Sequence, residues 1–139
     1  MIKLLDILNE ITTNPKNYNE FKDMEQEIFQ KQISYDEYKK SIESILPKND
    51  KKSLWLYNHH AAELAWEAGK EAEAKTHIAA AMKTNPFGNS ITNVLDFIIN
   101  RKGTKSQLTQ AMSQIKDKVE KETATKLLND PKYGGKLKD

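Results

Sequence analysis

The stretch SLWLYNHHAAELAWEAGKEAEAKTHIAAAMKTNP, residues 53–86, decides the fold of this chain. Its apolar residues recur every three or four positions, which is the period of an α-helix. Gly69 interrupts the pattern, and glycine readily adopts the left-handed backbone that ends a helix. Pro86 follows the second half of the pattern, where proline marks a helix boundary. The stretch therefore predicts two helices, 53–68 and 71–84, joined by a tight turn.

Helix 53–68 is apolar over an unusually wide arc. One stripe contains Leu54, Tyr57, Ala61, Leu64, Ala65 and Ala68, and a second contains Trp55, His59, Ala62 and Trp66. Such a helix must be covered on two sides, so we expect it at the centre of the molecule. Two interpretations of Trp55, His59 and Trp66 stay open. They line a partner-binding groove, since tryptophan is a favoured interface anchor, or they pack against neighbouring helical hairpins.

Similar helical patterns cover most of the remaining chain. Before the central hairpin we expect a helix over 2–11, a second with the stripe Tyr18, Phe21, Met24 and Ile28, and a third from a Ser34/Glu37 capping box to Pro47. After the hairpin we expect a helix across Ile91–Ile98. The last predicted helix starts at a Thr104/Gln107 capping box and has the stripe Leu108, Ala111, Ile115 and Val119. No segment alternates with the period of two that strands show. The predicted fold class is all-α, with about seven helices in stacked antiparallel hairpins or an irregular bundle. Residues 1–131 form one domain, and 132–139 form a flexible basic tail.

Small residues follow the turn of the central hairpin at fixed intervals. Gly69, Ala74, Ala81 and Pro86 are separated by five, seven and five positions. With Ile78 between the two alanines, residues 58–86 resemble a tetratricopeptide repeat (TPR), a helix–turn–helix unit of about 34 residues. The chain departs from the family pattern at Asn58 and Ala65, where the family has tryptophan and tyrosine. The resemblance implies a TPR-like scaffold whose stacked hairpins receive a peptide on a concave face.

Composition limits the classes of function. The chain has 139 residues, 37% hydrophobic and 30% charged, with a formal net charge of +2. It lacks cysteine, which excludes a disulfide scaffold, a thiolate nucleophile and a sulfur-bound zinc. The N-terminus has no unbroken apolar stretch with a cleavage site, as a secretory signal would, and no stretch is long enough to span a membrane. We expect a cytoplasmic protein with no membrane partner.

The sequence offers little for catalysis or for a metal. It has no glycine-rich phosphate loop, no nucleophile elbow and no kinase motif. His60 and Glu63 lie one helical turn apart, a spacing at which two side chains can bind one metal. A di-iron type of site needs further pairs from other helices, and no second pair occurs. We therefore expect a solvent-facing His60 beside Glu63 and Glu67, and a non-enzyme with no cofactor and no metal.

Basic residues accumulate toward the C-terminus. From Arg101 onward there are ten basic and five acidic residues. The candidate phosphate contacts are Arg101, Lys102, Lys105, Lys132, Lys136 and Lys138. Only Arg101 is an arginine, which disfavours specific reading of base edges. The alternating charges of 116–122 are also typical of a solvated helix face.

Three hypotheses of function follow. The leading one is an adaptor that binds another protein or peptide, or a second copy of itself, through the face around Trp55, His59 and Trp66. The alternative is a nucleic-acid-associated accessory protein that uses the basic C-terminal part. The third is a small structural subunit whose acidic first third meets the basic last third of a neighbour.

Salt dependence separates the first two hypotheses. Lysine contacts to phosphate release counterions, so the affinity for DNA or RNA should fall steeply as salt rises. A gel-shift titration at low and high salt measures this, with a variant truncated after Pro131 as the comparison. Absence of any shift at low salt removes the nucleic-acid alternative. If the protein binds DNA or RNA tightly and the truncation abolishes this binding, the nucleic-acid hypothesis replaces the adaptor as the leading one.

Overall fold

The computed structural model describes residues 15–88 and 90–139, so the predicted helix 2–11 lies outside the described residues. In the described part every regular element is helical, which confirms the all-α class. The elements are α2 (Tyr18–Phe29), α3 (Tyr35–Glu43), α4 (Lys51–Glu67), α5 (Glu71–Thr84), α6 (Ile91–Ile99), α7 (Lys105–Met112), α8 (Lys118–Asn129) and the short 3₁₀ helix η1 (Gly134–Lys136).

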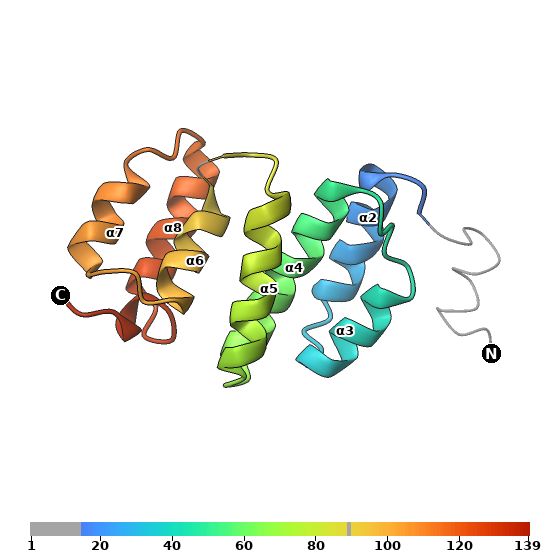
Figure 1. Cartoon of the computed structure of the whole chain (residues 1–139), viewed down its shortest axis with the longest axis horizontal. Coiled ribbons are helices and arrows are strands. Elements are labelled where there is room, and N and C mark those ends of the chain that lie inside the picture. The colour runs from blue at the N-terminus through green and yellow to red at the C-terminus, as the bar shows by residue number, and fades with distance from the viewer. Residues whose placement is uncertain (1–14, 89) are drawn as a thin grey trace.

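The helices lie side by side in a row, with α4 and α5 in the middle (Figure 1). Helix α4 packs chiefly against α5, and it also contacts α2 and α3 on one side and α6 on the other. The prediction that the helix 53–68 is central is therefore confirmed. Helix α8 contacts α6, α7 and η1 and completes the other end of the row. No helix within the described ranges has the length and apolar composition needed to cross a bilayer.

The turn between α4 and α5 forms as the sequence predicted. Gly69 has a φ of 78°, in the left-handed region that glycine adopts without steric cost. The Lys70 N–H donates to the Ala65 carbonyl at 2.8 Å, and the Gly69 N–H donates to the Trp66 carbonyl at 3.0 Å. This pair of bonds is a Schellman motif, which satisfies carbonyls at the end of α4 and reverses the chain.

Small side chains let α4 and α5 pack closely. Ala61 and Ala65 of α4 are fully buried, and so are Ala74 and Ala81 of α5. Ile78 lies one turn from each of the α5 alanines and is also fully buried. The buried face of α5 is therefore the one that the spacing of these residues predicted.

Both predicted caps are present, and one differs in detail. The Ser34 hydroxyl accepts from the Glu37 N–H at 3.2 Å, as expected, but the Glu37 carboxylate accepts from the Ser34 hydroxyl and not from its backbone. At Thr104 both bonds of the capping box form with Gln107. A cap of this kind contributes about 1 kcal/mol to helix stability.

The single helix predicted after Thr104 is wrong, because the chain forms two helices there. Helix α7 ends at Met112, and α8 begins after Asp117, whose carboxylate accepts from the Glu120 N–H at 3.0 Å. Ala111 and Val119, both assigned to the predicted stripe, are exposed, Val119 by 71%. The Asp117–Glu120 pair is a helix-start signal that the charge alternation obscured.

The C-terminal segment packs against the molecule, so the prediction of a flexible tail does not describe it. Tyr133 and Leu137 are buried, and the Lys105 N–H donates to the Lys138 carbonyl at 2.8 Å. A Cβ atom on Gly134 would collide with the Leu128 carbonyl. Glycine therefore allows the segment to cross the end of α8 at close range.

Leucine at position 74 should destabilise the protein, because it adds three carbons to a fully buried site. Overpacking of this kind costs about 1–3 kcal/mol of unfolding free energy. Ala72 is exposed on the same helix and serves as the matched control, since exposed substitutions usually change stability by less than about 0.5 kcal/mol. Urea unfolding of Ala74→Leu and Ala72→Leu measures the difference. Equal stabilities would mean that a different face of α5 is buried.

Candidate functional site

The predicted Trp55, His59 and Trp66 stripe is largely buried, and its side chains bond to neighbouring elements. The three residues are 8%, 4% and 7% exposed. The Trp55 indole N–H donates to Thr92 Oγ1 of α6 at 2.7 Å, and His59 Nδ1 lies 3.0 Å from the same oxygen. The Trp66 indole N–H donates to the Lys132 carbonyl at 2.6 Å. Packing against neighbouring elements, the second of the two interpretations, describes these side chains.

The geometry assigns the protons of the His59 cluster. An indole N–H can only donate, so Thr92 Oγ1 accepts from Trp55, and a carboxylate can only accept, so the His59 nitrogen that faces Glu63 is a donor. His59 Nε2 then carries a hydrogen toward Glu63 Oε1, 2.9 Å away. Burial is the largest effect and raises the pKa of Glu63, but the hydrogen bond from His59 and the charges of His59 and His60 together outweigh it, so the pKa is lowered.

His60 joins α4 to α2 through Glu25, and the prediction of a solvent-facing His60 beside Glu63 and Glu67 is wrong. The Glu25 side chain is fully buried. Its Oε2 accepts from the Tyr38 hydroxyl at 2.7 Å and lies 2.5 Å from His60 Nδ1. The His60 ring stacks on Phe29 at a centroid distance of 3.9 Å. The Glu25–His60 pair is therefore an internal contact of the fold.

Opposing effects act on the pKa of His60. Burial disfavours the charged imidazole and lowers the pKa, whereas the hydrogen bond and the negative charge of Glu25 raise it. The interaction with Glu25 prevails, and the pKa is raised above its ordinary value. A sequence signal for this pair existed, because Glu25 lies four positions after Phe21 and three before Ile28, within the buried stripe of α2.

Both ring nitrogens of His77 have hydrogen-bond partners. Its Nδ1 lies 2.9 Å from the Asn58 amide oxygen, and its Nε2 lies 2.7 Å from the Tyr35 hydroxyl. An amide oxygen only accepts, so Nδ1 of His77 carries a hydrogen. Burial, followed by the nearby charge of Lys39, lowers the pKa of His77.

The described residues place no three histidine, aspartate or glutamate side chains together as metal ligands. His60 contacts Glu25, and His77 contacts Tyr35 and Asn58, so these histidines are directed to different partners. Their contacts join α4 to α2 and α5 to α3 and α4. In the described part of the chain, the histidines therefore serve as connections between helices.

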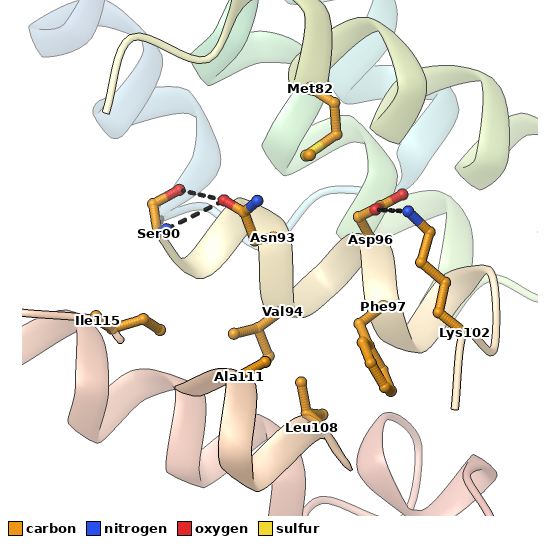
Figure 2. Close-up of a pocket in the computed structure, with 10 residues that line it drawn as sticks. All are labelled: Met82, Ser90, Asn93, Val94, Asp96, Phe97, Lys102, Leu108, Ala111 and Ile115. Carbon is orange, nitrogen blue, oxygen red and sulfur yellow. Dashed lines mark hydrogen bonds and ion pairs between the residues drawn. The ribbon is translucent and has the colours of Figure 1, made fainter. Parts of the chain in front are cut away.

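A small apolar pocket opens between α5, α6 and α7 (Figure 2). We call it the α6–α7 pocket; its volume is about 230 Å³, and it is lined by Met82, Ser90, Asn93, Val94, Asp96, Phe97, Lys102, Leu108, Ala111 and Ile115. Val94 and Phe97 point from α6 toward Leu108 and Ala111 of α7. Val94 and Leu108 are buried, Phe97 is half-buried and Ala111 is exposed. The pocket thus has a buried apolar floor and partly exposed walls.

The polar groups at the two ends of the α6–α7 pocket already have partners. Asp96 accepts from Lys102 at 2.6 Å and from the Asn100 amide at 2.8 Å. The Asn93 side chain accepts from the Ser90 N–H at 3.1 Å, as part of the capping box of α6. The interior of the pocket is therefore available for apolar contacts, while the Asp96 carboxylate already accepts hydrogen bonds from Lys102 and Asn100.

The basic residues proposed for nucleic acid do not form one free patch. Arg101 pairs with Glu71 at 3.1 Å and lies over the Trp66 ring, Lys102 pairs with Asp96, and Lys105 lies 3.4 Å from Asp139. Lys132 and Lys136 line a second cavity, of about 260 Å³, with Trp66, Glu67, Gly69 and Glu71. Lys138 is exposed near the C-terminus. Acidic residues therefore pair with, or line the same cavity as, five of the six candidate basic residues.

The fold and the pocket define an all-α protein whose central helix carries polar contacts to its neighbours. Comparison with known proteins identifies no matching family model, no similar curated protein and no similar solved structure. The resemblance of residues 58–86 to a tetratricopeptide repeat therefore stays a prediction. Inference about function has to start from the cavities and their chemistry.

The His60–Glu25 pair predicts how stability changes with pH. A group whose pKa is raised on folding stabilises fully below its unfolded pKa, here 6.5, and loses that contribution as pH rises through the folded pKa. The unfolding free energy of wild type relative to His60→Gln should therefore be largest at about pH 6 and smaller at about pH 9. Urea unfolding of both proteins across this range measures the difference.

His77 supplies the opposite control, because its pKa is lowered on folding. The unfolding free energy of wild type relative to His77→Gln should increase, not decrease, as pH rises through about 6.5. A His60→Gln difference that is independent of pH, or that grows with pH, would contradict the assignment of His60 as the charged partner of Glu25.

Proposed function

We propose that this protein is a non-catalytic interaction module that binds another protein through the α6–α7 pocket. The observation that carries the proposal is a cavity with a buried apolar floor whose walls, Met82, Phe97 and Ala111, are partly or fully exposed. A concave, mostly apolar cavity with a few polar groups at its edge is the usual form of a binding site. The surface differs from the Trp55–His59–Trp66 stripe, which is covered.

The size of the pocket favours a side chain over a free metabolite. Pockets for drug-sized ligands have volumes of about 300–1,000 Å³, and this one measures about 230 Å³. Its apolar walls suit one leucine, methionine or phenylalanine of a partner segment, and its polar ends suit the backbone on either side. Such an anchor in a small pocket, surrounded by a polar rim, is the usual organisation of a binding hot spot.

The same geometry gives less support to the other functions considered. Catalysis would need an available acid, base or nucleophile in the cavity, and Asp96, which lines it, is occupied by Lys102 and Asn100. Phosphate binding would need cations free of internal pairing, and Arg101, Lys102 and Lys105 lie within ion-pair distance of Glu71, Asp96 and Asp139.

Filling the pocket tests the proposal. Ala111 is exposed and lines the cavity, so Ala111→Phe should occupy it without disturbing the core. Peptides would be selected from a displayed random library on the wild-type protein, and their affinities measured by fluorescence anisotropy. We expect selected peptides to share one apolar anchor, whose change to alanine costs about 2 kcal/mol or more of binding free energy. We expect Ala111→Phe to abolish their binding.

Gln110→Phe is the matched control, because Gln110 is the exposed neighbour of Ala111 on α7 but does not line the pocket. It should bind the selected peptides as wild type does. The proposal is wrong if the library yields no specific peptide, if the peptides lack an apolar anchor, or if both variants bind them equally.

A further inference from the structure

A larger cleft lies where the start of α4, the loop after α5 and the start of α8 meet. Its volume is about 600 Å³, and it is lined by Trp55, Phe87, Gln114, Lys116, Asp117 and Glu120. It shares no lining residue with the α6–α7 pocket. We call it the Trp55–Phe87 cleft. Its volume falls within the range of about 300–1,000 Å³ that is usual for ligand sites.

One wall of the cleft is aromatic. Phe87 meets Trp55 edge to face, with ring centroids 4.9 Å apart and planes at 70°. The Trp55 N–H is already donated to Thr92, so the part of the indole that lines the cleft contributes ring carbons. Phe87 is 49% exposed, and it is one of two large hydrophobic residues that remain exposed in the described part of the chain. An exposed phenylalanine held against a tryptophan forms a surface on which a flat group can stack.

The part of the cleft that α8 and its N-cap contribute is acidic. Asp117 caps α8, and Glu120 follows one turn later on the same helix. Burial raises the pKa of Glu120, and the negative charge of Asp117 raises it further, against the opposing effects of His59 and the Ile91 N–H. Among the described residues that line the cleft, Lys116 is the only basic one, so two carboxylates are present with one ammonium group. The carboxylate pair therefore favours a cation and repels phosphate.

From this combination we propose that the Trp55–Phe87 cleft binds the guanidinium group of an arginine from a partner protein. A guanidinium is planar, stacks on aromatic rings and donates to carboxylates in a fork. The aliphatic part of the side chain lies along Phe87 and Trp55, and the charged end reaches Asp117 and Glu120. Cation–π attraction and charge complementarity thus act on the same group.

This inference concerns a different surface from the α6–α7 pocket and does not depend on its function. Failure of peptides to enter the α6–α7 pocket leaves the arginine site intact, and the reverse also holds. The two sites are distinguished by their variants, since Ala111→Phe changes only the α6–α7 pocket and Phe87→Ala only the cleft.

The test uses the two tryptophans of the full chain as reporters. Their indole N–H signals would be followed by ¹⁵N–¹H nuclear magnetic resonance (NMR), with Trp66 as internal reference, because its N–H is bound at Lys132 outside the cleft. The probes are blocked tripeptides with arginine, citrulline or glutamate between two alanines. Citrulline matches arginine in shape but carries no charge. We expect arginine to shift the Trp55 signal saturably, and citrulline and glutamate to have little effect.

Variants locate the arginine within the cleft. Phe87→Ala should raise the dissociation constant of the arginine peptide roughly two- to fivefold, the factor for an exposed cation–π contact. Glu120→Gln should raise it as well, while its amide oxygen can still accept from the Ile91 N–H. Glu122→Gln is the control on the exposed face of α8 and should bind as wild type does.

Any of the following outcomes would overturn the proposal: citrulline binding as tightly as arginine, no saturable shift of Trp55 with arginine, a shift of Trp66 alone, or unchanged affinity in both Phe87→Ala and Glu120→Gln. Circular dichroism of each variant establishes that it is folded before binding is compared. A preference for the glutamate peptide would reassign the cleft to Lys116 and equally reject the arginine site.

Discussion

The close approach of α4 and α5 is the constraint on which the other packing depends. It involves small side chains: Ala61, Ala65, Ala74 and Ala81 are all fully buried, and a longer side chain at a closely packed position costs stability. The pair occupies the middle of the row, with α2 and α3 against one side and α6 against the other (Figure 1). A displacement at this interface would therefore shift elements on both sides of it.

Polar side chains of α4 fix where the neighbouring elements sit. His60 reaches Glu25 of α2, His59 reaches Thr92 of α6, and Asn58 accepts from His77 of α5. Buried polar groups are costly when unpaired, so each of these contacts disfavours arrangements that would break it. Buried polar and ionic groups often contribute more to a unique structure than to net stability. Of these residues, His59 belongs to the stripe that the sequence suggested as a partner-binding face, and its ring is bonded to Thr92.

The two cavities proposed as binding sites both involve residues of the α6–α8 end of the row. The α6–α7 pocket is apolar between partnered polar ends, whereas the Trp55–Phe87 cleft combines aromatic rings with two carboxylates. One surface therefore suits an apolar side chain and the other suits a basic one. Together they suit a partner segment that contains both apolar and basic residues. Basic side chains near the C-terminus lie mostly beside acids of the same chain, which leaves the acidic cleft as the better-defined electrostatic feature.

The sequence by itself determined the helices, the central position of α4 and the turn at Gly69, because helical periodicity and cap bonds involve residues only a few positions apart. It did not separate α7 from α8, since the start signal at Asp117 lay within a run of alternating charges. Only the tertiary structure decided that Trp55 and Trp66 are covered, that Glu25 meets a histidine 35 residues away, and that the C-terminal segment folds back. The reason is physical: a local pattern shows that a face is apolar, but whether a neighbour covers it depends on contacts between distant segments.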